Sequence, residues 1–514
     1  MVVLACGMSL ALSPPARAES ADTEPDTSYA AGLPDLETVG LSLDQAQRLA
    51  AANSPSSRAA VAALRSARGA RMKEAGAFDP VLTAAEQKVS TDTPVSSPFA
   101  GSKLRSRSRS GGLAWLSPLG TSVNLTLSQL RSETNAPFAT LSPERDARAR
   151  IDFVQPLWHG FGPAAARGEL RALDREVESA RAALAAATLD LSADVENAYW
   201  DLYAAEHRLG VERLLRQRAA VFLRDQVLRG RAGVVGPGAV AIARTFLAQQ
   251  ETALLDARIA AAGASDHLAQ VMGARPQGEA LYRCLDEPAP AAAVEPLSSV
   301  LARAFAANPS LRAARADSGA AQARARRAAW NAWPTLEAFG GYGASGLAGV
   351  GRQVVLGTDT IGTVYDTGFD QAWTQVGHRD FPDWNFGVRL RLPIGWRADR
   401  GERERVMGNY DRAREALRAR QLALESEVRA AHREADIASR ELDAAGTLVQ
   451  SAEEQARIAR LEYQAGRGTA YDLVNLEGDL AAARQRETEV KVRIAHATTE
   501  LRRLTLAAPG GTKR

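Results

Sequence analysis

Apolar side chains keep a helical spacing over two exceptionally long stretches of the chain. Pro163 opens the first stretch, and no further proline occurs before Pro237. Within it, apolar residues recur every seven positions, as in coiled coils: Leu170, Val177, Leu184, Leu191 and Ala198, with Val195, Leu202 and Leu209 on a second track. Residues 164–229 and 398–465 are therefore predicted to form two helices, each about 100 Å long at ~1.5 Å per residue. This spacing alone fits a plain antiparallel coiled coil as well as a closed ring of helices.

A second pattern, with a period of two, predicts strands. In residues 385–392 the apolar side chains Phe386, Val388, Leu390 and Leu392 alternate with Asn385, Gly387, Arg389 and Arg391. Residues 122–128 and 151–153 alternate in the same way. Such alternation is typical of a β-barrel strand between lipid and water, and also of a half-buried strand in a soluble sandwich.

Four tryptophans mark the ends of the predicted strands, where an aromatic girdle would contact a membrane interface: Trp158, Trp333, Trp384 and Trp396. Residues 93–111, with the alternating run from Arg105 to Arg109, and residues 346–383 are expected to be long polar loops. The strand-like stretch 112–130 leaves open whether the first half of the chain carries an additional hairpin. About four spanning strands are too few to close a barrel, since the smallest barrels have eight, so the chain is expected to oligomerise.

The order of these elements occurs twice along the chain. Each copy has a helical opening, a strand that begins at proline, a polar region, a strand that closes on proline, and a long helix broken at an Ala-Gly pair. The matching positions are Asn53 and Asn308, Pro80 and Pro334, Pro156 and Pro393, and Ala232-Gly233 and Ala465-Gly466. The duplication predicts a first repeat at 41–273, a linker rich in Pro and Ala at 274–296, and a second repeat at 297–508. Residues 19–40 are an N-terminal extension and 509–514 a C-terminal tail.

The first eighteen residues are predicted to be a signal peptide. They hold an apolar segment followed by Ala16-Arg17-Ala18, a cleavage pattern, so export from the cytoplasm is expected. A second interpretation is open, in which Cys6 is a lipid attachment site. The other cysteine is Cys284, so no disulfide framework is expected.

Composition narrows the classes of function. The chain carries 63 Lys+Arg against 60 Asp+Glu, which gives a net charge of +3 and no sign of a nucleic-acid partner. No apolar stretch after the signal is long enough for an ordinary transmembrane helix, so any span must consist of strands. The six histidines are scattered without metal-ligand spacing, and neither a nucleophile elbow nor a phosphate loop occurs. We therefore expect neither an enzyme nor a bound metal or cofactor.

The whole arrangement resembles the TolC-like outer-membrane efflux family. The residues that carry the resemblance are the stretches Asn308-Pro309-Ser310-Leu311, Leu392-Pro393-Ile394, 195–202 and 463–473. The resemblance implies a mostly α fold with a membrane β-barrel: a homotrimer with four strands per protomer, hence a twelve-stranded barrel, on a long α-helical periplasmic barrel. It also implies the outer membrane of a Gram-negative bacterium, a periplasmic adaptor (membrane fusion protein), and an inner-membrane transporter of the RND, ABC or MFS type.

The resemblance also assigns site residues. It implies that Tyr463, Arg467 and Asp472 form the gate and the pore constriction, and that the helix tips at Gly233, Val234, Gly466 and Arg467 contact the adaptor. Asp472 can equally be an N-terminal helix cap, and both roles can hold. The first repeat departs from the family pattern, because Ala239 stands where an aspartate is common, so the usual partner of Tyr463 is expected to be absent.

Together these observations predict an exit duct of a tripartite efflux or type I secretion system. The alternative is a periplasmic coiled-coil adaptor or structural protein, which would explain the helices without requiring two sets of alternating strands. The exported substrate is not encoded in any of these patterns.

Overall fold

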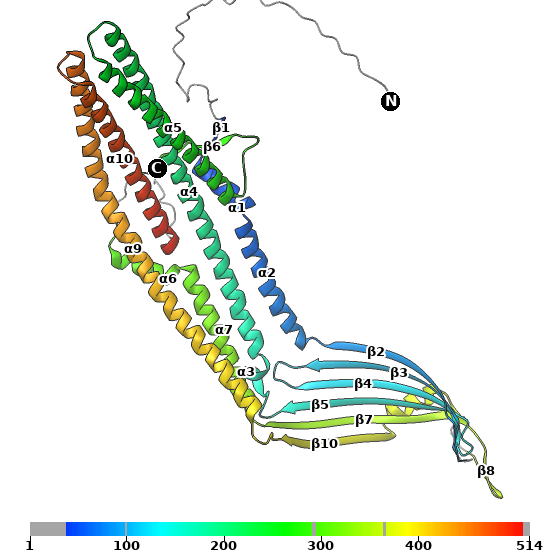
Figure 1. Cartoon of the computed structure of the whole chain (residues 1–514). Helices are drawn as coiled ribbons and strands as arrows, with labels where there is room; N and C mark the ends of the chain where they lie inside the picture. The colour runs from blue at the N-terminus through cyan, green and yellow to red at the C-terminus, as the bar shows by residue number, and fades with distance from the viewer. Residues whose placement is uncertain (1–36, 98–99, 290–293, 363–365, 507–514) are drawn as a thin grey trace, which may run out of the picture.

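The chain forms a long bundle of helices with a curved sheet at one end (Figure 1). The computed structural model describes residues 37–97, 100–289, 294–362 and 366–506. The predicted signal peptide, Cys6 and residues 509–514 lie outside the described residues. Within the described residues, no helix combines the length and the apolar character needed to cross a membrane.

Ten α-helices occur in the described part of the chain, and two of them are the predicted long ones. The helix α4 spans 64 residues and α9 spans 68, each about 100 Å at ~1.5 Å per residue. The seven-residue tracks lie buried along α4, as at Val177 and Leu202. The helices are α1 Leu43–Asn53, α2 Pro55–Ala75, α3 Gly162–Ala166, α4 Gly168–Arg231, α5 Pro237–Met272, α6 Leu297–Ala307, α7 Pro309–Asn331, α8 Phe369–His378, α9 Arg397–Gln464 and α10 Ala470–Thr505.

The helices α10 and α5, which are the second helices of the two long hairpins, end against the starts of α7 and α2. Asn308 stands at the start of α7, where its Oδ1 accepts from the Leu311 amide at 3.1 Å. Its Nδ2 donates to the carbonyl of Leu504 near the end of α10, also at 3.1 Å. The buried side chain of Asn308 therefore forms hydrogen bonds with an otherwise unpaired backbone amide at the start of α7 and an otherwise unpaired carbonyl at the end of α10. In the other repeat, Gly273 at the end of α5 lies against the Asn53 carbonyl, with a positive φ of 67° that a side chain would strain.

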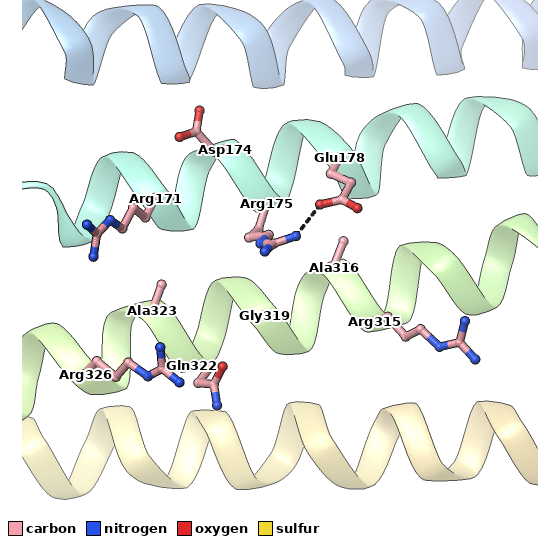
Figure 2. Close-up of a pocket in the computed structure, with 10 residues that line it drawn as sticks. All are labelled: Arg171, Asp174, Arg175, Glu178, Arg315, Ala316, Gly319, Gln322, Ala323 and Arg326. Carbon is pink, nitrogen blue, oxygen red and sulfur yellow. Dashed lines mark hydrogen bonds and ion pairs between the residues drawn. The ribbon is translucent and has the colours of Figure 1, made fainter. Parts of the chain in front are cut away.

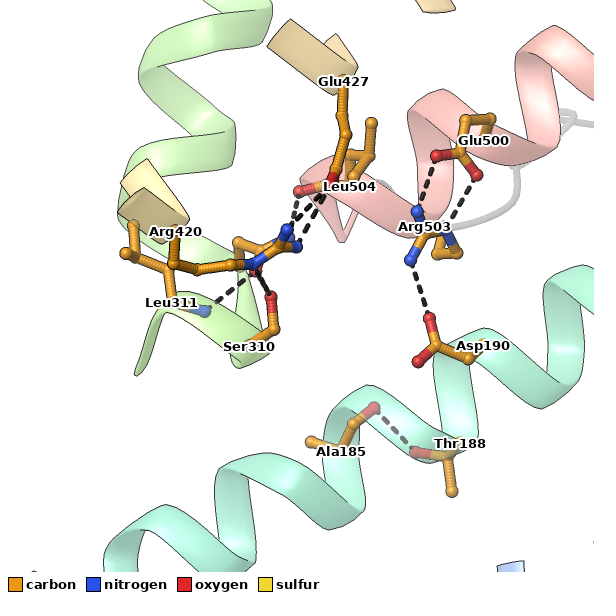
Figure 3. A network of polar contacts seen from close by, with 11 residues as sticks. Ala185, Thr188, Asp190, Ser310, Leu311, Arg420, Glu427, Glu500, Arg503 and Leu504 are labelled. Atoms are coloured by element: carbon orange, nitrogen blue, oxygen red, sulfur yellow. Dashed lines mark hydrogen bonds and ion pairs between the residues drawn. The ribbon is translucent and has the colours of Figure 1, made fainter. Parts of the chain in front are cut away.

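Polar contacts join these helices to the long ones (Figure 3). Arg503 of α10 bonds to Asp190 of α4 at 2.8 Å and to Glu500 on its own helix. Arg420 of α9 pairs with Glu427 at 2.7 Å and donates to Ser310 of α7 at 2.9 Å. These contacts fix the neighbouring helices against one another.

A six-stranded antiparallel sheet continues from the helices, in the order β10-β7-β5-β4-β3-β2. Four strands come from the first repeat and two from the second. They are β2 Val81–Asp92, β3 Lys103–Leu116, β4 Ser122–Thr134, β5 Leu141–Pro156, β7 Thr335–Gly351 and β10 Phe381–Arg391. A small hairpin, β8 Val354–Leu356 and β9 Asp359–Ile361, and the helix α8 stand between β7 and β10.

The family resemblance implies four strands per protomer, and this expectation is wrong because the sheet of this chain has six strands. The open question at residues 112–130 is answered by a pair of strands, β3 and β4. The expected loop 93–111 is also wrong, because Arg105 to Arg109 lie within β3. Arginine and serine alternate there with a period of two, but neither is apolar, so the run looks like a loop when only apolar alternation is sought. Residues 346–383 similarly contain the end of β7, the hairpin and α8 instead of an uninterrupted loop.

Within the predicted linker, Leu281–Cys284 form β6, which pairs in parallel with β1, Thr38–Leu41. Tyr199 of α4 holds this pair against the bundle. Its hydroxyl donates to the Leu41 carbonyl at 2.9 Å and accepts from the amides of Leu285 and Asp286 at 3.0 Å. The Cys284 thiol, whose pKa is raised by burial, donates to the Tyr199 carbonyl at 3.3 Å.

Glu206 supports β6 from α4 and predicts a pH dependence of stability. Both carboxylate oxygens lie 3.3 Å from the Cys284 amide, and burial raises the pKa of Glu206 to about 7. Because the pKa of Glu206 is higher in the folded chain than in the unfolded chain, the protonated carboxyl favours the fold. This contribution to stability is complete below the unfolded pKa and disappears as pH rises through about 7. Glu206→Gln keeps an acceptor without the charge, so it should raise the free energy of unfolding on the order of 1 kcal/mol above pH 7 and have little effect at pH 5.

Thermal unfolding of the purified protein at several pH values tests this prediction. Glu404→Gln, at an exposed position on α9, is the matched control and should change the midpoint equally little at every pH. An equal effect of Glu206→Gln at pH 5 and pH 8 would contradict the assignment.

Candidate functional site: the helix tips

The two long hairpins end in nearly identical turns at the far end from the sheet (Figure 1). Gly233 and Gly466 both have a φ of +72°, which glycine adopts without strain. In each turn the next amide reaches back to the helix: Val234 N to Arg229 O at 2.8 Å, and Arg467 N to Glu462 O at 2.9 Å. These are the hydrogen bonds that end helices at a left-handed glycine. Val234 and Arg467 therefore project into solvent at the two tips.

Tyr463 connects the two hairpins just inside the tips. Its hydroxyl donates to Asp225 Oδ2 of α4 at 2.8 Å and accepts from the side chain of Gln226. Arg229 pairs with Asp225 at 3.0 Å and places its guanidinium over the Tyr463 ring, 4.8 Å from the centroid. Burial, followed by the Asp225 hydrogen bond, raises the pKa of Tyr463, so its hydroxyl stays a donor at neutral pH.

Tyr463 therefore has an acidic partner other than the usual one that this sequence lacks. Ala239 lies near the start of α5 and supplies none, but Asp225 reaches Tyr463 from the end of α4. The signal in the sequence was the spacing of Asp225 and Arg229, one helical turn apart near the predicted break. That spacing occurs on many solvent-exposed helices, and only the fold brings it to Tyr463.

A second polar contact lies next to the first and was not predicted from the sequence. Glu477 of α10 is buried, and its carboxylate binds Arg218 of α4 and, at 3.0 Å, Arg460 of α9. We refer to Arg218, Asp225, Arg229, Arg460, Tyr463 and Glu477 as the tip cluster. The cluster lines a groove of 590 Å³, and Phe222 and Leu473 also line it.

The other predicted gate residues stay apart from the tip cluster. Asp472 is exposed and is the third residue of α10, where it completes a capping box. Thr469 Oγ1 accepts from the Asp472 amide at 3.1 Å, and Asp472 Oδ2 accepts from the Thr469 amide at 3.3 Å. Thr469, rather than Asp472, is the N-cap, and Arg467 forms no ion pair with any residue that the structure describes. The capping role of Asp472 leaves its exposed carboxylate available for a second role.

The two faces of the sheet differ in polarity. On one face, β5, β7 and β10 carry a polar cluster in which Arg150 binds Asp152 at 2.9 Å and reaches Asp383 and Asn385 across β7. Arg150 crosses that strand because Gly341 has no side chain. The opposite face exposes apolar side chains in a continuous band: Leu82, Leu113, Leu125, Ile151, Tyr342, Trp384, Phe386, Val388 and Leu390. Trp384 is the fourth residue of β10, and Trp158, Trp333 and Trp396 follow or precede strands at the helical end.

A second groove, also of 590 Å³, lies between α4 and α7 near the sheet (Figure 2). Arg171 and Arg175 line it from α4, and Arg315 and Arg326 line it from α7. Arg175 pairs with Glu178 at 2.8 Å. No group of three or more His, Cys, Asp or Glu side chains that could hold a metal ion occurs among the described residues. The groove wall is charged and suits contact with water.

The chain thus combines two long helical hairpins that meet in polar tips with a sheet that is apolar on one face. Residues 300–505 match the family model described as Outer membrane efflux protein. The matched residues make up less than half of the chain, and this part of the chain is similar to that family.

Solved structures share the fold over most of their length. The outer-membrane channel OprN is 18% identical with a TM-score of 0.63, and the match covers 90% of this chain and 89% of that one. The outer membrane protein VceC of Vibrio cholerae is 16% identical with a TM-score of 0.62, covering 90% and 95%. The CmeC outer membrane channel of Campylobacter jejuni is 14% identical with a TM-score of 0.62, covering 90% and 85%. No curated protein matches the chain significantly.

Proposed function

We propose that three copies of this chain join their six-stranded sheets into one barrel of eighteen strands, and that the helices continue it as a periplasmic duct. Solutes delivered by an inner-membrane transporter through a periplasmic adaptor would leave the cell by this path. Such a channel supplies no energy, so the direction of transport is set by the transporter.

The observation that carries this proposal is the pair of open sheet edges. Every residue of β2 is exposed, as are all but one of β10. The chain runs away from the helices in β2 and toward them in β10 (Figure 1). A β2 strand therefore fits antiparallel beside the β10 strand of a neighbouring copy. Six strands are too few to close alone, and a lipid-exposed edge leaves backbone groups without hydrogen bonds.

The polarity of the two faces of the sheet indicates which face would lie outside the closed barrel and which would lie inside. The apolar face suits lipid, and the face with Arg150, Asp152 and Asp383 suits a water-filled lumen. The sequence also left open a periplasmic coiled-coil adaptor. Such a water-surrounded protein would not need a sheet with a broad exposed apolar face. We therefore retain the channel.

The tip cluster supports a gate at the periplasmic end. It ties α4 to α9 and α10, so the two hairpins of one protomer can separate only if these contacts break. Three exposed Asp472 carboxylates near the axis would favour cations at the constriction. Arg467, which forms no ion pair with a described residue, is left for a contact with a neighbouring copy or with the adaptor.

Photo-cross-linking tests whether a periplasmic adaptor docks on the helix tips. A photoreactive amino acid at Val234 or Arg467 should cross-link to a periplasmic adaptor co-produced from the same bacterium. The same probe at Leu422, exposed on α9 far from the tips, is the control and should capture little. Equal capture at Leu422 and at the tips would contradict docking through Gly233, Val234, Gly466 and Arg467.

A further inference from the structure

Four cationic side chains stand directly opposite one another across four neighbouring strands. Lys88 of β2 pairs in register with Arg107 of β3, Arg107 with Arg131 of β4, and Arg131 with Arg145 of β5. Neighbouring strands are ~4.8 Å apart, so four positive charges line up within about 15 Å. Like charges in directly opposite positions destabilise a sheet unless something neutralises them. We refer to these four residues as the cation row.

Acidic neighbours neutralise only part of this charge. Glu86 binds Arg107 and lies 3.4 Å from Arg109, and Glu133 binds Arg131 at 2.5 Å. Lys88 forms no ion pair with a described residue, nor does Arg105. Two further rows of side chains lie on the same face, one on each side of the cation row. Together the three rows hold six cationic side chains and two carboxylates: Lys88, Arg105, Arg107, Arg109, Arg131 and Arg145, with Glu86 and Glu133.

The cation row lies on the apolar face of the sheet, beyond the apolar band. In β3 the side chains of Trp115, Leu113 and Arg107 share one face, and Arg107 lies eight positions from Trp115, about 26 Å along the strand at ~3.3 Å per residue. Strands of outer-membrane barrels tilt by ~35–45°, so this length corresponds to ~20 Å of height, slightly less than the ~25 Å lipid-facing band of such barrels. The row is thus placed where the hydrocarbon ends on the side away from the helices.

The helix α8 independently marks the same boundary. It packs Ala372 and Val376 against Ala147 and Ala348 on this face of the sheet and exposes polar side chains, including Gln371 and Thr374. A helix with a polar outer side suits the headgroup region. Arg145 is attached beside it, because its Nη1 donates to the Thr367 carbonyl at 2.5 Å.

We propose that the cation row binds the phosphate groups of the phosphorylated glycolipid in the outer leaflet. Lys88, Arg107 and Arg131 are exposed and Arg145 is half-buried, so the row presents donors to a ligand beside the barrel. Arginine binds phosphate through two parallel hydrogen bonds, and a diphosphorylated headgroup supplies the charge that two glutamates leave unneutralised. This inference rests on the proposed function, because it requires the apolar face to contact lipid.

Thermal unfolding of the purified full-length trimer with added lipid tests the inference. Diphosphoryl lipid A should raise the unfolding midpoint, and the dephosphorylated lipid should not. Arg107→Gln combined with Arg131→Gln should weaken lipid A binding about tenfold or more, since each cation near an anionic surface contributes measurably. The same exchange at Arg148 and Arg391, on the lumen face of the same sheet, is the matched control and should leave binding unchanged.

Several outcomes would overturn the inference. They are equal stabilisation of the double variant and the wild type, stabilisation by the dephosphorylated lipid, and equal stabilisation by inorganic pyrophosphate, which would indicate a simple anion site. Arg107→Lys with Arg131→Lys keeps the charge and shows whether a loss reflects misfolding. If the proposed function fails instead, the wild type itself will not be recovered as a trimer from the outer membrane.

Discussion

Replacing Asp225 by alanine is expected to open the periplasmic end of the proposed channel. The substitution removes the acceptor of the Tyr463 hydroxyl and the carboxylate that pairs with Arg229. We estimate a loss of about 1 kcal/mol from the closed arrangement of each protomer, since these groups are partly exposed. Three protomers that open together lose ~3 kcal/mol, which raises the open population by roughly 100-fold.

Single-channel recordings of the purified trimer in planar bilayers measure this effect. Glu477→Gln should act in the same direction, because it leaves Arg218 and Arg460 facing each other with a weaker acceptor. Asp436→Ala is the matched control, since Asp436 pairs with Arg440 at 2.9 Å on the exposed side of α9. If intact trimers of the Asp225 variant conduct as the wild type does, the tip cluster only joins the hairpins and is not the gate.

Cysteines placed on the two open edges are expected to link the three chains covalently. Thr83 of β2 points to the polar face, so it is one partner, and Asn385, Gly387 and Arg389 of β10 are tested in turn as the other. One or two of these pairs should form disulfides between copies, because the Cβ atoms of opposite residues on paired strands are ~4.5–5.5 Å apart and closest in non-hydrogen-bonded pairs, near the ~3.5–4.5 Å of a disulfide. The Cys284→Ser background removes the native thiol of the described chain.

Denaturing gels under non-reducing conditions should then show a covalent trimer that reduction converts to monomer. Ser128→Cys paired with the same β10 positions is the control. Ser128 lies in β4, an interior strand, and should give monomer only. Cross-linking of Ser128 as efficient as that of Thr83 would mean that β2 is not the edge between copies.

The long helices and their ends could be predicted from the sequence because the signals are local. The seven-residue tracks predict α4, and the absence of proline between Pro163 and Pro237 predicts its length. The left-handed glycines Gly233 and Gly466 end the helices where the Ala-Gly pairs indicate. Each of these features is decided within a few turns of chain, so pattern and structure agree.

The errors occur where a pattern is polar or a partner is distant in sequence. β3 was missed because its distal half has no apolar face: Arg105, Arg107 and Arg109 lie on one side and serines on the other. The pairing of Tyr463 with Asp225 joins residues 238 positions apart, and no local pattern specifies it. The parallel pair β1 and β6 depends on Tyr199 in the same way.

The number of strands in the assembled barrel tests the central claim most directly. Cryo-electron microscopy of the detergent-extracted outer-membrane particle counts chains and strands in one map. The account predicts three chains and a closed barrel of eighteen antiparallel strands, with β2 of each chain beside β10 of the next. A twelve-stranded barrel with β3 and β4 folded outside it, or a particle that is not a trimer, would contradict it.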